Sequence, residues 1–170
     1  MIRVVKEKLE NVVAGGVLRA IRSDLAPVNA ASRDVVFAAG DAIEEHLMNT
    51  GPLPLGGAVI TPGGDLPADF LIHVVVMSED EPQTSMTVQR ALKNGLRRAA
   101  DWAIETLAVP PLGLSVGLIE PEESARALVE ILFDHVDEGR PPLSLQIVVQ
   151  SSYEIDLFKQ LIGEMSRDRG

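Results

Sequence analysis

Apolar residues recur with two different periods along this 170-residue chain, and the alternation of those periods predicts the order of its elements. Short runs of Val, Ile, Leu and Ala are typical of buried strands, whereas apolar residues three and four positions apart are typical of helices. The predicted strands are residues 2–6, 9–14, 25–30, 58–60, 70–77, 107–109 and 143–149. The predicted helices are residues 35–48, 84–106, 121–135 and 151–167.

Strands that alternate with helices predict a largely parallel sheet with helices on both faces. The run 70–77 is almost continuously apolar, as a central strand covered on both faces should be. Gly15-Gly16 is expected to end the second strand, and Pro121 to open a helix at its first position. Because no linker or repeat interrupts the pattern, we expect one domain over residues 1–170.

The amino-acid composition excludes several kinds of core and functional site. Apolar residues make up 46% of the chain but aromatic residues only 4%, so the core must be aliphatic. The chain has no cysteine, which excludes disulfides, thiolate metal sites and a cysteine nucleophile. Its three histidines have no metal-ligand spacing, so we expect neither a metal nor a resident cofactor.

The formal net charge of −10 disfavours binding to a nucleic-acid backbone, and we expect no direct DNA binding. The net charge does not exclude a small anionic ligand, because backbone N–H groups at a helix N-terminus can hold a diphosphate without lysine. The apolar runs are too short to cross a bilayer, and no secretory signal pattern is present. We therefore expect a cytoplasmic protein that does not bind membranes.

One short segment points to a family. Asn29-Ala30-Ala31-Ser32 follows an apolar run and resembles the Asn-Ala-Ala-Asn signature of macro domains, which bind ADP-ribose. Further segments resemble the same family in the same order, and they are residues 55–61, 66–73, 107–113 and 122–127. Agreement of several segments in order and spacing is more specific than one short motif.

The resemblance identifies the chain as a divergent member of the macro domain, or Appr-1''-p processing, family. It implies a three-layer α/β/α fold whose mixed, mostly parallel sheet is flanked by helices. It also implies an ADP-ribose-like small molecule or an ADP-ribosylated protein as partner. Binding is the first functional hypothesis. The alternatives are an ADP-ribosyl hydrolase or O-acetyl-ADP-ribose deacetylase, and a degenerate macro domain with a structural or interaction role.

The site positions depart from the family pattern. The family's adenine-binding Asp has no counterpart at Gly15-Gly16-Val17, and Ser32 stands where the family has its last Asn. The loop that wraps the phosphates is expected at residues 35–40, where only Gly40 remains of its glycines. In the second loop, residues 113–118, Gly113, Val116 and Gly117 are kept. These departures favour a modified or weakened site.

Residue by residue, the resemblance implies a candidate site. The implied ligand contacts are Asn29, Ala30, Ser32, Gly40, Gly113, Leu114, Ser115, Val116, Gly117 and Tyr153. Asp41 is the one candidate catalytic acid, although it stands one residue out of register.

Each candidate also has a purely structural interpretation. Asn29 could contact a ligand or pin its own loop, and Tyr153 could stack on a sugar or pack at a helix start. Ser32 is favoured as a capping hydroxyl over a nucleophile, because no histidine lies near it in sequence. Asp41 is favoured as a partner of the helix dipole over a general base. His73, inside an apolar strand, is favoured as a core histidine over a ligand. The loop glycines could equally serve phosphate or a turn.

Overall fold

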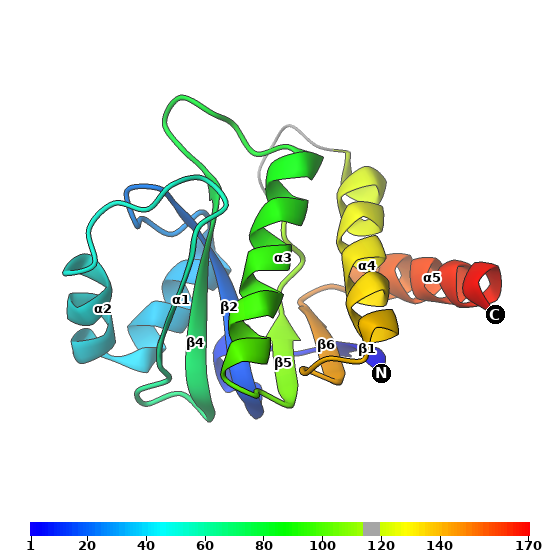
Figure 1. The fold of residues 1–170 in the computed structure, drawn as a ribbon, viewed down its shortest axis with the longest axis horizontal. Helices are drawn as coiled ribbons and strands as arrows, with labels where there is room; N and C mark the ends of the chain where they lie inside the picture. The colour runs from blue at the N-terminus through cyan, green and yellow to red at the C-terminus, as the bar shows by residue number, and fades with distance from the viewer. Residues whose placement is uncertain (114–119) are drawn as a thin grey trace.

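The computed structural model describes residues 1–113 and 120–170, and Figure 1 shows them as a sheet between layers of helices. The strands are β1 Ile2–Lys6, β2 Ala14–Arg22, β3 Ala58–Pro62, β4 Ala68–Met77, β5 Thr106–Val109 and β6 Ser144–Val149. The helices are η1 Leu9–Asn11, a 3-10 turn, with α1 Ala30–Ala39, α2 Asp41–Met48, α3 Ser85–Asp101, α4 Pro121–Glu138 and α5 Ser152–Arg169.

The described strands form one sheet in the order β1-β6-β5-β2-β4-β3. Every neighbouring pair is parallel except β3 and β4, which run antiparallel. The sheet is therefore mixed and mostly parallel, which confirms the predicted fold class. The five parallel strands all end at one edge, and in such sheets that edge is where ligands bind.

Helices cover both faces of this sheet (Figure 1). α3 and α4 pack on one face, where they bury the side chains of Leu18 and Leu107. The 3-10 turn η1 and helices α1 and α2 pack on the other face, over Val17 and Ile21. α5 packs against α4 and β1. Adjacent residues of β2 thus point into different cores, as the two-residue period of a strand requires.

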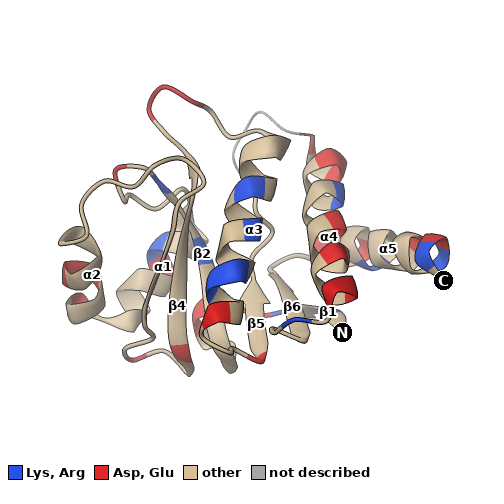
Figure 2. Ribbon diagram, viewed as in Figure 1, with Lys and Arg blue, Asp and Glu red and all other residues tan. Residues whose placement is uncertain are grey.

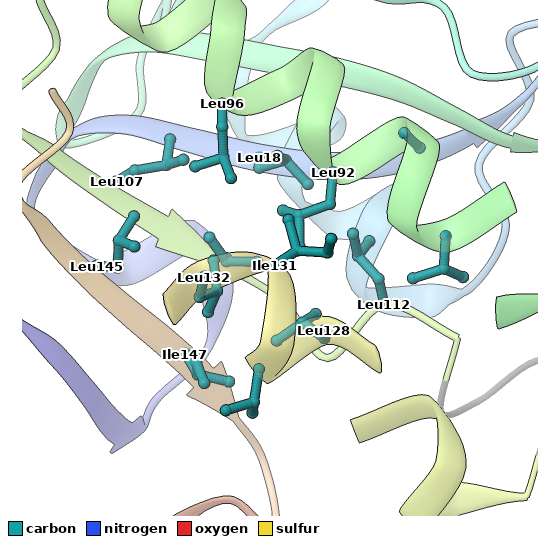
Figure 3. Packing of buried hydrophobic residues seen from close by; sticks show 14 of the residues in the cluster. Leu18, Leu92, Leu96, Leu107, Leu112, Leu128, Ile131, Leu132, Leu145 and Ile147 are labelled. Atoms are coloured by element: carbon teal, nitrogen blue, oxygen red, sulfur yellow. The ribbon is translucent and has the colours of Figure 1, made fainter. Parts of the chain in front are cut away.

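The core between α3, α4 and the sheet is aliphatic, as the composition predicted. Figure 3 shows leucine and isoleucine side chains from both helices meeting those of β2, β5 and β6. Phe158 on α5 is the one aromatic ring buried among them in the described chain. Burial of a Leu or Ile side chain stabilises the fold by roughly 1.5–3 kcal/mol.

The second predicted strand, residues 9–14, is wrong. This segment forms η1, and β2 begins at Ala14 and continues through the two glycines that were expected to end it. A Cβ on Gly15 would lie 3.2 Å from Thr106 O, and its N–H donates to Thr106 Oγ1 over 2.7 Å. The glycines therefore serve the close pairing of β2 with β5, and not a turn.

The third predicted strand, residues 25–30, is also wrong. After β2 the chain turns sharply, with Leu25 in the left-handed region at φ 75°. The segment then touches β2 through one isolated bridge between Ile21 and Pro27, and α1 begins at Ala30. Leu25 is buried by the tight turn, whereas Pro27 and Ala30 are exposed, so an apolar run here does not indicate a strand.

The helices were predicted with errors at their boundaries. The helix expected at 35–48 is two helices that meet at Gly40, whose φ of 106° is outside the helical region. The helix expected at 84–106 ends at Asp101, because Ala103 takes a positive φ of 53° and Thr106 already belongs to β5. The starts of α4 at Pro121 and of α5 after the cap Ser151 are confirmed. Among the described residues, no helix has the length and apolarity to cross a membrane.

Candidate functional site

A cleft of about 460 Å³ opens at the edge where the parallel strands end. Its walls come from the ends of β2, β5 and β6, from the segment before α1, and from Leu9 just after β1. Small-molecule sites in proteins typically have volumes of about 300–1,000 Å³. As bounded by the described residues, the cleft is large enough for a small ligand.

The first turns of three helices border this cleft. Ala30 and Ala31 open α1, Pro121 opens α4, and Tyr153 lies in the first turn of α5, and all four line the cleft. The first N–H groups of an α-helix lack intrahelical partners, and the helix dipole makes that end positive. Three such ends around one cavity favour an anionic ligand.

Asn29 and Ser32 form the cap of α1 beside the cleft. Asn29 Oδ1 accepts a hydrogen bond from the backbone N–H of Ser32 over 2.9 Å. The Ser32 hydroxyl donates to Ala20 O over 2.6 Å, which ties the helix to β2. Ser32 is buried. Ser32 thus has a structural role, but its hydroxyl ties α1 to β2 and the capping side chain is that of Asn29. Asn29 pins the loop and also lines the cleft.

A buried polar ladder runs across the sheet beneath α1, and sequence reasoning missed its first member. Arg19 Nε donates to both the carbonyl O and Oγ of Ser32, each over 3.1 Å. Arg19 Nη1 lies 2.9 Å from His73 Nδ1, and His73 Nε2 lies 3.0 Å from Thr61 Oγ1. Thr61 in turn donates to Pro62 O. These residues come from α1, β2, β4 and β3, so only the register of the strands brings them together.

The charges in this ladder follow from burial. Desolvation lowers the pKa of His73 well below 6.5, and the charges of Arg19 and His46 lower it further. Neutral His73 must accept from Arg19 at Nδ1, because a guanidinium has no acceptor, so its proton is on Nε2. Burial lowers the pKa of Arg19 to about 10, with the field of Glu44 opposing. Arg19 therefore stays charged at neutral pH, and its hydrogen-bond partners in the ladder are neutral.

The prediction of a phosphate loop at residues 35–40 is wrong, because residues 35–39 belong to helix α1 and Gly40 follows its end. α1 spans ten residues, or about 15 Å, and carries Gly40 away from the cleft. The end of α1 is held by the turn that joins β3 and β4, because Asp65 N in that turn donates to Ala39 O. Neither Gly40 nor Asp41 lines the cleft. Asp41 is exposed at the first position of α2, where the dipole interpretation fits it.

The segment Gly15-Gly16-Val17 is likewise distant from the cleft. It lies at the start of β2, and Gly15 lines a separate depression with Gly63 and Pro67 at the opposite edge of the sheet. The missing acid at this segment therefore carries no information about the cleft. The residue that follows β1 and lines the cleft is Leu9.

The second loop is described only at its start. Gly113 lines the cleft at φ 91°, and a Cβ there would overlap Ser124 Oγ, so the position requires glycine. The other implied contacts in this loop, Leu114, Ser115, Val116 and Gly117, lie outside the described residues.

Two residues at the start of α5 complete the cleft. Tyr153 lines it with 61% of its surface exposed, so its ring is accessible to a ligand. Glu154, which sequence reasoning did not place in the site, lines it too and accepts from Ser151 Oγ over 2.9 Å. The capping-box spacing of Ser151 and Glu154 was the sequence signal that could have placed Glu154 here. For Arg19 the sequence signal was weaker, a charged residue inside an apolar strand.

The remaining candidates have structural partners. His73 is a core histidine held in the ladder, as its favoured interpretation had it. His135 is buried and its Nε2 lies 3.1 Å from Pro142 O. Within residues 1–113 and 120–170, no three histidine or acidic side chains are grouped so that they could hold a metal ion.

Comparison with known proteins identifies the family. The sequence model of the Macro domain family matches residues 20–128, which include the Asn29 turn, Gly113 and every member of the ladder except Arg19. The chain belongs to the macro domain family. An uncharacterized protein of Aeropyrum pernix is 42% identical over 92 residues, and one of Aquifex aeolicus is 34% identical over 92 residues. These matches cover 52% and 54% of this chain, and 48% and 56% of the relatives, so the chain spans about half of their lengths.

One relative is named for an activity. The O-acetyl-ADP-ribose deacetylase of Enterobacter cloacae is 27% identical over 120 residues, which cover 69% of this macro domain and 67% of that protein. Among solved structures, a macrodomain of Oceanobacillus iheyensis with ADP superposes with a TM-score of 0.81 at 18% identity, over 97% of this chain and 91% of that one. The Trypanosoma brucei macrodomain in complex with ADP gives 0.84 at 12% identity, over 95% and 69%. At such identities these structures confirm the fold.

Proposed function

We propose that the cleft binds ADP-ribose or a related nucleoside diphosphate. The observation that carries this proposal is the meeting of three helix N-termini at the carboxyl edge of the sheet, around a cavity of about 460 Å³. Structures of this fold have been solved with ADP, and one mutant of the Oceanobacillus macrodomain with ADPR. Asn29, Ala30, Gly113 and Tyr153 are the described contacts that we assign to the ligand.

Isothermal titration with ADP-ribose tests this proposal. We expect saturable binding, weakened by Tyr153→Ala because the exposed ring would no longer pack against the ligand. Phe37→Ala is the matched control, since Phe37 is 82% exposed on α1 and does not line the cleft. Absence of heat and of any thermal shift at millimolar ADP-ribose would reject the binding function.

Hydrolysis of an ADP-ribosyl bond or an acetyl ester is the second candidate function. The likeness to the Enterobacter deacetylase supports it, and Glu154 is the carboxylate that lines the described cleft. Glu154, however, also accepts from Ser151 Oγ and Gln150 N, which suits a helix cap. We therefore rank binding first. Turnover of O-acetyl-ADP-ribose that is lost in Glu154→Gln and kept in Asp41→Ala would reverse this order.

A degenerate domain with only a structural role is the third candidate, and the open cleft counts against it. A closed cavity would have favoured that role, whereas this one is bordered by helix N-termini and an exposed tyrosine. We propose a cytoplasmic location, which a chain without cysteine fits, and an ADP-ribosylated protein as the macromolecular partner. Cell fractionation, and pull-down on ADP-ribosylated against unmodified protein, test these two points.

A further inference from the structure

The guanidinium of Arg19 is a buried positive charge at the cleft. Arg19 lines the cleft, yet only 1% of its surface is exposed, because the first turn of α1 covers it. Its side chain is held on both sides, by Ser32 and by His73. The charge therefore has a fixed position directly below the Asn29–Ser32 turn.

The field of Glu44 partly offsets this charge, but no described carboxylate pairs with it. Among the described residues, Arg19 forms no ion pair, and its hydrogen bonds go to a carbonyl, a hydroxyl and a neutral imidazole. Glu154 is the one carboxylate on the described cleft wall, and it is bonded within its own helix cap. The field of Arg19 therefore adds to that of the α1 N-terminus.

A structural role alone does not require a cation. The tie to Ser32 needs a hydrogen-bond donor, which a neutral amide also provides. Burying an unpaired charge is costly, and replacing buried ionic groups by apolar ones of similar volume is often neutral or stabilising. A guanidinium at this position is therefore better explained by a negative group that comes from outside the protein.

We propose that Arg19 is a specificity-determining residue of the cleft, whose buried charge selects ligands that place a phosphate or carboxylate beside the Asn29–Ser32 turn. It acts as a positioning residue, through its field and through Ser32. This inference rests on the proposed function, because it assumes that the cleft binds a nucleotide. It deepens that function by making charge, and not only shape, the basis of selection.

The test compares Arg19→Lys with Arg19→Gln and Arg19→Met in titrations with ADP-ribose. Lysine keeps the charge but cannot reproduce the Nε contacts to Ser32, whereas glutamine keeps a donor and removes the charge. We expect Arg19→Lys to bind within about threefold of the parent, and both neutral variants roughly tenfold or more weakly. Adenosine, which has no phosphate, should bind all four proteins alike in ligand-observed NMR.

Controls separate this effect from misfolding. Arg33→Gln removes an exposed cation in the first turns of the same helix, and it should leave the affinity within about twofold because Arg33 is solvated beside Asp34. Circular dichroism and thermal melting establish that each variant is folded. If one neutral variant does not fold, the other still carries the comparison.

The outcomes distinguish the inference from the function on which it rests. If the parent binds ADP-ribose and a folded neutral variant binds it equally well, Arg19 has no role in selection and only the inference falls. If Arg19→Lys and Arg19→Gln lose ADP-ribose affinity equally, the charge is not what matters, and Arg19 has only the structural role of holding Ser32. If the parent binds no nucleotide at all, the proposed function fails and the inference fails with it.

Discussion

Ser32 donates to Ala20 O and accepts from Arg19 Nε, and these two bonds use the one proton of the hydroxyl and one of its two lone pairs. The serine that replaces the family's last Asn therefore fixes the helix to the sheet and has no further proton to donate to the cleft. Asn29 keeps its place at the cap of α1 and still lines the cleft.

Ser32→Ala should lower the free energy of unfolding by about 1–3 kcal/mol, because it leaves the buried Ala20 carbonyl without this donor. Urea denaturation measures the change, and about 2–4 °C in Tm accompanies each 1 kcal/mol for a chain of this size. Ser166→Ala on the exposed side of α5 is the control, and it should change stability by less than about 0.5 kcal/mol. Equal effects of the two substitutions would contradict the assigned role of Ser32.

His73 should make stability depend on pH. Its pKa is depressed in the folded state, so below about pH 6.5 the unfolded chain binds the proton more readily. The free energy of unfolding should therefore fall as pH falls from about 6.5, by up to about 1.4 kcal/mol per pH unit. Above that pH the contribution is constant.

His73→Asn isolates this contribution. Asparagine keeps an acceptor for Arg19 but does not titrate, so the slope between about pH 6.5 and pH 5 should be smaller in the variant by up to about one proton. Urea denaturation at several pH values gives both slopes. Identical slopes would show that His73 titrates normally in the folded protein.

At the scale of elements, the segment 30–48 decides what kind of site this chain has. Val35, Val36 and Ala39 bury their side chains under α1, so residues that the family resemblance assigned to a phosphate loop are held in a helix. Gly40 then separates α1 from α2 at the far edge of the sheet. The cleft wall formed by α1 is accordingly a helix N-terminus with a capped turn.

Gly40→Ala should destabilise the fold by about 1–3 kcal/mol and leave ADP-ribose affinity within about twofold. Alanine is strained at φ 106°, and its Cβ would lie 3.2 Å from Asp65 Oδ2. Gly163→Ala inside α5 is the matched control and should stabilise by about 0.5–1 kcal/mol, since its Cβ meets no closer atom than Arg167 at 3.7 Å. A large loss of affinity in Gly40→Ala would place Gly40 in the site after all.

At the scale of the whole molecule, charge is distributed unevenly over an acidic chain. Figure 2 shows Lys and Arg along α3, and these are Arg90, Lys93, Arg97 and Arg98. Most of the charged residues on the neighbouring helix α4 are acidic. The basic side chains of α3 therefore form a single helical stripe beside a helix whose charged residues are mainly acidic.

We expect no retention of duplex DNA in mobility-shift or anisotropy measurements at about 150 mM salt, because the net charge of −10 repels the phosphate backbone. Replacing all four basic residues of the α3 stripe by Gln should therefore leave the DNA measurement unchanged. Micromolar binding that this substitution abolishes would show that the stripe overrides the net charge.

Local pattern was sufficient where one force decides the outcome. The apolar run of β4, the amphipathic stripe of α3 and the starts of α4 and α5 each depend on interactions within a few residues, and all were predicted. It failed at residues 9–14, which begin with a 3-10 turn, and at residues 25–30, where a sharp turn follows β2. At Gly15-Gly16 the closeness of β5 decides the structure, and the bonded residue Thr106 is 91 positions away from Gly15 in the sequence.

The sequence by itself determined the fold class, the aliphatic core and the family, because burial periodicity and several ordered segments are properties of the chain read in one dimension. The tertiary structure alone decided the contents of the cleft. Arg19, His73 and Thr61 meet only through the register of β2, β4 and β3. Gly40 leaves the site only because residues 30–39 close into a helix. These are contacts between distant segments, and their energies have no counterpart in local pattern.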